Sequence, residues 1–150
     1  MRILATIAVM LALATALNAQ SRRRAPVVRA NIQQTTDIIN DCERRTNKFK
    51  KTLDRALARD NVRAGDRREE HLNRTAERLE NQLDRVGDAW NRDHDIDRTR
   101  DHVRAAVAMS GDIDNAMRRW NMGRDAESEW AVLRSQLNHL ANTFNLRRVR

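Results

Sequence analysis

Apolar residues recur at steps of three and four in four successive blocks of this chain, at 32–56, 72–90, 96–120 and 126–144. This spacing puts one apolar stripe along one side of a helix. The pattern therefore predicts four amphipathic helices. The predicted core positions are Ile32, Thr35, Ile39, Cys42, Thr46, Phe49, Leu53, Ala56, Leu72, Ala76, Leu79, Leu83, Val86, Trp90, Ile96, Thr99, Val103, Ala106, Ser110, Ile113, Met117, Trp120, Ala126, Trp130, Leu133, Leu137, Leu140 and Phe144.

Short polar breaks separate the four blocks. Pro26 suits the first turn of the first helix, and Asp66 with Glu69 has capping-box spacing for the second. Asp93 and Asp95 are good caps for the third helix, and Gly123 marks the last turn. Because the connections are short, each helix must fold back on its neighbour. The predicted fold is all-α, an antiparallel up-down-up-down four-helix bundle over residues 27–146.

The first 19 residues have the layout of a secretory signal peptide. Met1 and Arg2 precede an apolar run from 3 to 17, and small residues surround a cleavage point after Ala19. The run is about 22 Å long as a helix, shorter than the roughly 30 Å hydrocarbon core of a membrane. We therefore expect an exported protein, periplasmic or extracellular. An uncleaved membrane anchor stays open, because arginines follow the run.

Composition supports one domain, and charge separates its ends from its middle. Of 150 residues, 40% are hydrophobic, and 29 are Lys or Arg against 21 Asp or Glu. Eight of the basic residues lie outside 30–146, so the middle is formally neutral. A neutral fold with few aromatic residues argues against nucleic-acid binding. We expect basic, solvated, disordered ends at 20–26 and 147–150. Their candidate polyanion contacts are Arg22, Arg23, Arg24, Arg147, Arg148 and Arg150.

No motif in the chain specifies a reaction. Cys42 is the only cysteine and falls on the predicted core stripe, so we expect a buried thiol rather than a nucleophile or an intermolecular disulfide. The acids from Asp93 to Asp101 resemble a calcium loop, but Arg98 stands where that loop needs Gly. We interpret these acids as helix caps and a polar face. We predict no enzymatic activity, no cofactor and no metal.

From Thr36 to Leu146 the chain resembles a family of small exported helical bacterial proteins of unassigned activity. Its upstream part fits the family pattern at Phe49, Leu53-Asp54, Ala56-Leu57 and Arg67-Arg68-Glu69. The shared pattern comprises Asp112-Ile113-Asp114, Met117-Arg118-Arg119, Trp130-Ala131-Val132-Leu133-Arg134, Leu137-Asn138, Leu140-Ala141 and Phe144-Asn145. The chain departs from it at Met122-Gly123 and at Arg147-Arg148. The resemblance implies an exported helical fold and no particular reaction.

Three functions are consistent with these features. The first is a non-catalytic interaction or structural module of the cell envelope, with an envelope protein or a polyanion as its partner. The second is a periplasmic chaperone of the Spy type, although the Leu-Thr-x-x-Gln signature of those proteins is absent. The third is binding of polyanions or anionic lipid through the arginine-rich ends, which predicts an affinity that falls with salt.

Overall fold

The computed structural model describes the backbone of residues 4–59, 67–120 and 122–149 and the side chains of 31–58, 70–120 and 122–149. It contains four helices, α1 (Leu4–Arg59), α2 (Arg67–Asp93), α3 (Ile96–Arg119) and α4 (Arg124–Thr143), and no strand within these ranges. The chain divides into two compact units, Met1–Gln34 and Thr35–Arg150. The first unit holds the beginning of α1, and the second holds the bundle.

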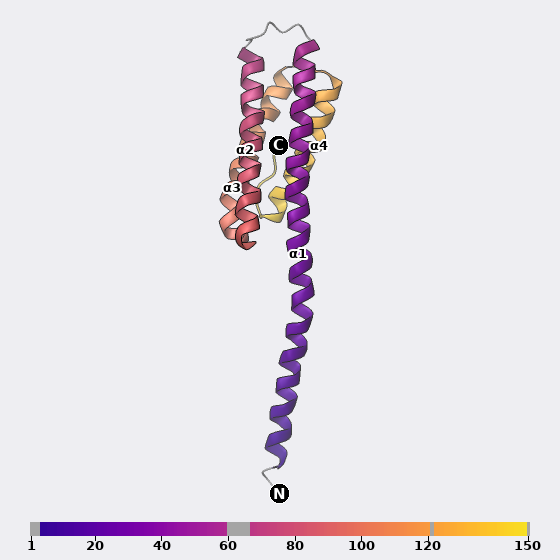
Figure 1. Cartoon of the computed structure of the whole chain (residues 1–150), viewed down its shortest axis with the longest axis vertical. Coiled ribbons are helices and arrows are strands. Elements are labelled where there is room, and N and C mark those ends of the chain that lie inside the picture. Colours follow the sequence, from indigo (N-terminus) through magenta and orange to yellow (C-terminus); the bar gives the residue numbers. More distant parts are fainter. Residues whose placement is uncertain (1–3, 60–66, 121, 150) are drawn as a thin grey trace. The chain divides into compact units, whose positions relative to one another are not determined.

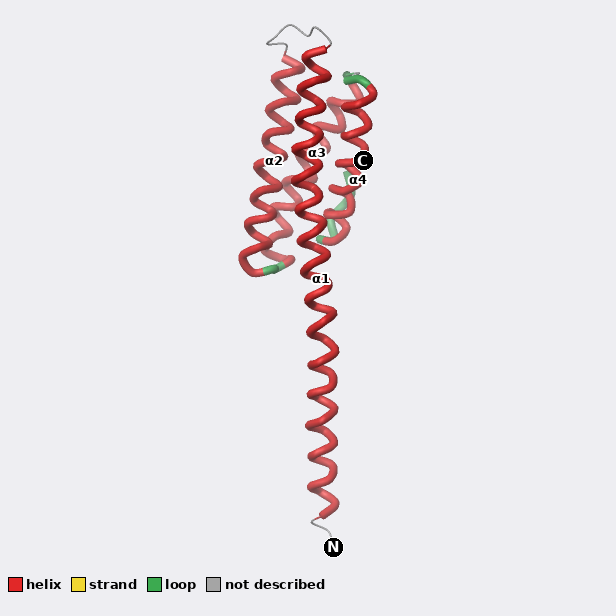
Figure 2. Tube along the Cα trace, turned by 45° about the vertical axis from the view of Figure 1, so that its right-hand side comes forward, coloured by secondary structure: helices red, strands yellow, loops and turns green. Residues whose placement is uncertain are grey.

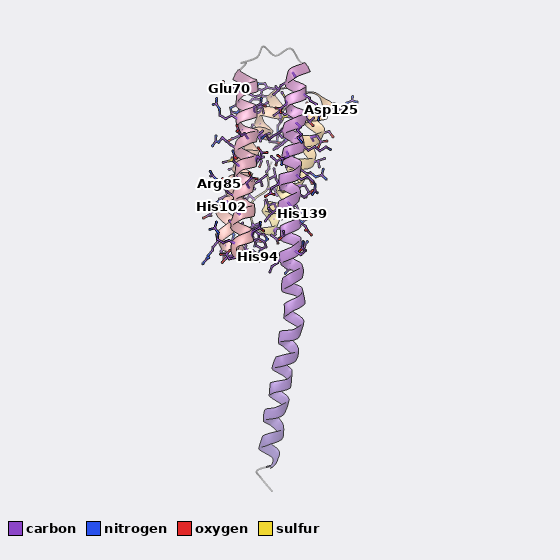
Figure 3. The ribbon with its side chains drawn as sticks, in the orientation of Figure 1. Glu70, Arg85, His94, His102, Asp125 and His139 are labelled. Carbon is purple, nitrogen blue, oxygen red and sulfur yellow. The ribbon has the colours of Figure 1, made fainter. Side chains whose placement is uncertain are left out.

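The second unit is the predicted four-helix bundle. Figure 1 shows α1 and α2 side by side, with α3 and α4 behind them. The α2–α3 turn lies at one end of the bundle and the α3–α4 turn at the other (Figure 2). Glu70 and Asp125 mark the end that lies away from His94 (Figure 3). The prediction of an antiparallel all-α bundle is confirmed.

Contacts between the helices fix their antiparallel register. The indole Nε1 of Trp90 on α2 donates to Thr36 Oγ1 on α1 over 2.9 Å, and further along α1 Lys50 pairs with Glu80. The rings of Trp90 and Phe144 have centroids 6.1 Å apart. The partners of Thr36 and Lys50 therefore follow one another in the opposite order along α2. This order makes α1 and α2 antiparallel, as a short connection requires.

The core follows the predicted stripes closely. Of the 28 predicted positions, 24 are buried; Ile32, Ala56 and Trp120 are half-buried. Ile96 is the exception, with 40% of its surface exposed. It is the first residue of α3, where the apolar stripe reaches the end of the bundle and no further turn covers it.

The helix ends correct two predictions and confirm one. α1 includes residues 20–26, where we expected a disordered segment, and Pro26 does not mark its first turn. The fixed φ of proline fits a helix, although it removes one hydrogen bond. Asp95 caps α3 as predicted, because its Oδ1 accepts from the backbone N–H of Asp97 and Arg98. The predicted capping residue Asp66 lies outside the described residues.

α1 and α2 approach closely where α2 has no side chain. A Cβ at Gly87 would lie 2.6 Å from Glu43 Oε1, so the Glu43 carboxylate rests over this glycine. Burial raises the pKa of Glu43, and the nearby charges of Asp84 and Asp88 raise it further. The ionised form of Glu43 is thus disfavoured in the folded protein.

We predict that Glu43→Gln stabilises the protein at pH 7. The folded pKa of Glu43 lies above its unfolded value, so the wild type loses stability as the pH rises through that interval. The gain should be about 0.5 kcal/mol, the scale for a partly exposed charge. Urea unfolding at pH 7 and at pH 3 measures it, and the two proteins should match at pH 3. A less stable variant at pH 7 would contradict the prediction.

Candidate functional site

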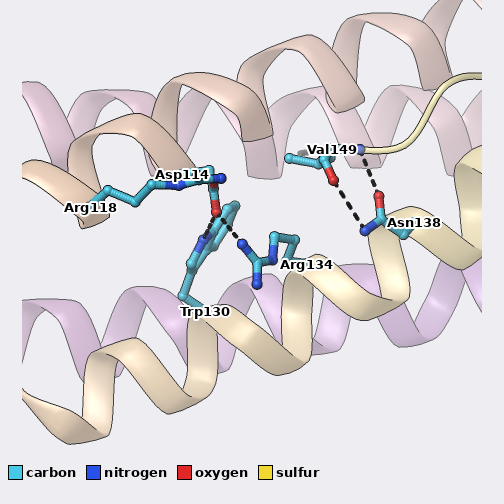
Figure 4. A network of polar contacts seen from close by, with 6 residues as sticks. All are labelled: Asp114, Arg118, Trp130, Arg134, Asn138 and Val149. Carbon is cyan, nitrogen blue, oxygen red and sulfur yellow. Dashed lines mark hydrogen bonds and ion pairs between the residues drawn. The ribbon is translucent and has the colours of Figure 1, made fainter.

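Three residues of α4 form a polar ladder that faces α3 and the C-terminal segment. Trp130, Arg134 and Asn138 are spaced by four, so they lie one above another on one side of the helix. Figure 4 shows Trp130 and Arg134 reaching Asp114, and Asn138 reaching Val149. The ladder therefore joins two distant parts of the chain to α4.

Asp114 of α3 is the buried end of this network. Its Oδ1 accepts hydrogen bonds of 2.8 Å from Trp130 Nε1 and from Arg134. Its Oδ2 accepts from Arg118 Nε over 2.8 Å, and the same guanidinium donates a second bond. Only 3% of the Asp114 side chain is exposed. Four donors thus surround one desolvated carboxylate.

These donors outweigh the cost of burying the charge. Burial by itself would raise the pKa of Asp114, but the hydrogen bonds from Trp130, Arg118 and Arg134 lower it below the usual value. The group is therefore a carboxylate at neutral pH. Its lone pairs are taken by four donors, so Asp114 is poorly suited to act as a general base or a metal ligand.

A second feature, which we call the C-terminal strap, comprises residues 145–149. Asn145 has a φ of 54°, and the N–H groups of Asn145 and Leu146 donate to Asn142 and Ala141, at 3.1 and 2.8 Å. This bonding is that of a Schellman helix end with Asn in the left-handed position. Such an end turns the chain back toward the helix it has just left.

Asn138 anchors the strap at Val149. Its Oδ1 accepts from the Val149 N–H over 2.7 Å, and its Nδ2 donates to the Val149 carbonyl over 3.4 Å. Val149 is only 8% exposed. Arg100 of α3 donates to the Phe144 carbonyl over 3.2 Å just before the strap begins. The prediction of a disordered tail at 147–150 is thus corrected for residues 147–149, because an amide clamp and a buried side chain hold them.

Few contacts hold the strap. Val149 is buried, Leu146 is half-buried, and Asn138 forms two hydrogen bonds with Val149. Local segments with few buried apolar contacts open at a lower free energy than the core does, so the strap should open far more readily than the bundle unfolds.

The candidate polyanion contacts near the C-terminus are exposed, and one of them forms a hydrogen bond within the fold. Arg147 and Arg148 both face solvent, and Arg148 Nε donates to Asn142 Oδ1 over 3.1 Å. Arg150 lies outside the described residues. Three further candidates are positions on α1 whose side chains are not described, namely Arg22, Arg23 and Arg24.

Acidic residues are missing from the part of the sequence that forms this region. None occurs in 102–111 of α3 or in 131–150, which covers most of α4 and the strap, whereas the second stretch carries four arginines. Of the α3 acids that border it, Asp101 pairs with Arg104 and Asp114 pairs with two arginines, whereas Asp112 is exposed. We call residues 102–111 and 131–149 the acid-free region.

The other candidates from the sequence are engaged within the fold. Cys42 is buried, and burial together with Asp41 and Glu43 raises the pKa of its thiol to about 12. Asp93 and Asp95 accept backbone N–H bonds. Asp97 and Asp101 pair with arginines of their own helix. In the described part of the chain, no three acidic, His or Cys side chains gather to hold a metal ion.

Comparison of the chain with protein-family models, with curated proteins and with solved structures found no match. Within the described ranges, no helix combines the length and the apolar character needed to span a membrane.

We predict that Asp114→Asn destabilises the bundle by about 2–4 kcal/mol at pH 7. The amide would still accept from Trp130, but its NH₂ would oppose the Arg118 guanidinium, and the arginines would lose their counter-charge. The pKa of Asp114 is lowered on folding, so its stabilisation exists above the unfolded value and disappears as the pH falls.

Urea unfolding at several pH values measures this effect. Asp112→Asn is the matched control, because Asp112 lies two residues away on the same helix and is exposed. Equal unfolding midpoints for the two variants at pH 7 would show that the network does not stabilise the fold. The deficit of Asp114→Asn should shrink below about pH 4, the usual range for a carboxyl group.

Proposed function

We propose that this protein is an exported, non-catalytic binding module of the cell envelope whose partner is anionic. Export is supported by the signal-peptide layout of residues 1–19. A non-catalytic role is supported by Asp114 and Cys42. One is saturated with donors, and the other has a thiol pKa of about 12. Neither group is prepared for acid–base or nucleophilic chemistry.

The observation that carries the proposal is the acid-free region. Over most of the bundle, acids and bases alternate and pair, as Glu70 does with Arg74. In 131–150 there is no acid, and Arg147 and Arg148 lie exposed on the strap. Exposed cations in a stretch without acids attract an anionic partner.

A chaperone role gains less support from the surface. A holdase needs a sizeable apolar surface for unfolded clients, and large exposed patches mark such sites. Among the described residues, Ile96 and Val132 are the large apolar side chains that are exposed, at 40% and 36%. Single exposed apolar residues are ordinary in soluble proteins.

We predict that the double variant Arg147→Ser, Arg148→Ser weakens binding to anionic vesicles about 30-fold at low salt, because each basic residue near such a surface contributes about 1 kcal/mol. Co-sedimentation with vesicles containing about a third phosphatidylglycerol measures this, and affinity should fall steeply with added salt.

The matched control is Arg78→Ser, Arg85→Ser. Both arginines are exposed on α2, and the change in formal charge is the same. The control should bind almost as the wild type does. Equal weakening by the two double variants would mean that net charge alone matters, and would contradict the assignment of binding to the acid-free region. If neither the wild type nor the control binds the vesicles, the anionic partner is not a lipid surface.

Export predicts that the mature protein begins at Gln20. Expression in a Gram-negative host, fractionation and intact-mass measurement test this directly. The expected species lacks residues 1–19 and leaves the cytoplasm. A full-length species in the membrane fraction would instead support the uncleaved anchor that the arginines after the apolar run favour.

A further inference from the structure

The strap adds positive charge to a stretch of the chain that contains no acid. Arg147 and Arg148 come four and five residues after the end of α4, which has no acid after Glu129 and itself carries Arg134. The bordering α3 acid Asp114 is already neutralised by two arginines. Within the described residues no ion pair joins Arg147 or Arg148 to another side chain, so electrostatic attraction is not what keeps the strap in place.

The contacts with Asn138 hold the strap through its backbone, so they depend little on the side chains of the strap. Asn138 contacts the N–H and the carbonyl of one residue, and every amino acid except proline offers this pair. The buried valine adds a requirement for an aliphatic side chain at that residue. Backbone bonds for affinity and a buried side chain for specificity are the usual means of recognising an extended peptide.

We propose that Asn138 and the helical residues of the acid-free region around it, in α3 and α4, form a docking site for an extended acidic segment of a partner protein, which displaces the strap. An aliphatic residue of that segment replaces Val149 at Asn138. The acidic residues beside it pair with Arg147 and Arg148 of the released strap. The inference rests on the proposed function, since it names the class of anionic partner for the same surface.

Displacement needs little rearrangement. The strap is five residues long and is joined to α4 at Asn145, which already has the left-handed backbone of a helix end. The strap then acts as a competitor whose closed fraction lowers the apparent affinity for the segment.

A fluorescently labelled five-residue peptide, with a central valine between aspartates, is the probe. Fluorescence anisotropy measures its binding to the full chain, to Val149→Ser and to Asn138→Ala. Val149→Ser weakens the competitor and keeps both arginines, so it should bind the peptide about tenfold more tightly than the wild type does. Asn138→Ala should bind at least tenfold more weakly than Val149→Ser, and His139→Ala, an exposed neighbour on α4, should match the wild type.

A second peptide with arginines in place of the aspartates tests the role of charge. It should bind Val149→Ser at least tenfold more weakly than the acidic peptide does. Equal affinities for the two peptides, or acidic-peptide binding that Asn138→Ala leaves unchanged, would overturn the inference. Circular dichroism checks the folding of each variant, and Val149→Ala, which also keeps both arginines, replaces Val149→Ser if that variant is unfolded.

Anionic vesicles separate this inference from the proposed function. If the vesicles bind and depend on Arg147 and Arg148, but the acidic peptide does not bind Val149→Ser, the docking site is refuted and the anionic-partner proposal stands. If the peptide binds through Asn138 while vesicles do not bind, the partner is a protein segment and not a lipid surface.

Discussion

A buried carboxylate needs donors from its surroundings, and Asp114 imposes this requirement on the pairing of α3 with α4. Its charge is removed from water, so it is tolerable only while Trp130 and Arg134 from the facing helix and Arg118 from its own helix all reach it. An apolar seam tolerates small shifts between helices. The Asp114 contacts tolerate much less, and so they fix the rotation and height of α4.

The position of α4 also determines where Asn138 lies, further along the same helix. One turn beyond Arg134 the same face presents Asn138, and the Schellman end at Asn145 directs the chain back to meet it. Val149 is buried there although it lies after the last helix. The same face of α4 thus carries a saturated, rigid network at one end and a weakly held strap at the other. This contrast makes the second half the better candidate for binding.

The distribution of charge fits the same division. Around α1 and α2, opposite charges pair across helices, as Lys50 does with Glu80 and Lys48 does with Glu129. The last part of the chain has only basic charges. Of the neighbouring α3 acids, Asp101 and Asp114 pair with arginines and Asp112 is exposed. An anionic partner would complete on this surface the pairing that the rest of the bundle achieves internally.

The sequence by itself determined the number of helices, their antiparallel order and nearly all of the core, because apolar periodicity is a local property that one helix displays alone. It also gave the Asp95 cap. Only the tertiary structure decided the roles of Asp114, Asn138 and Val149. The role of each depends on the residues of other elements that contact it. In the sequence, Asp114 has only the spacing of an ordinary i, i+4 ion pair with Arg118, and the contacts from α4 become evident only in the structure. Burial of a charge and capture of a strap arise from residues distant in the chain, so no local pattern reveals them.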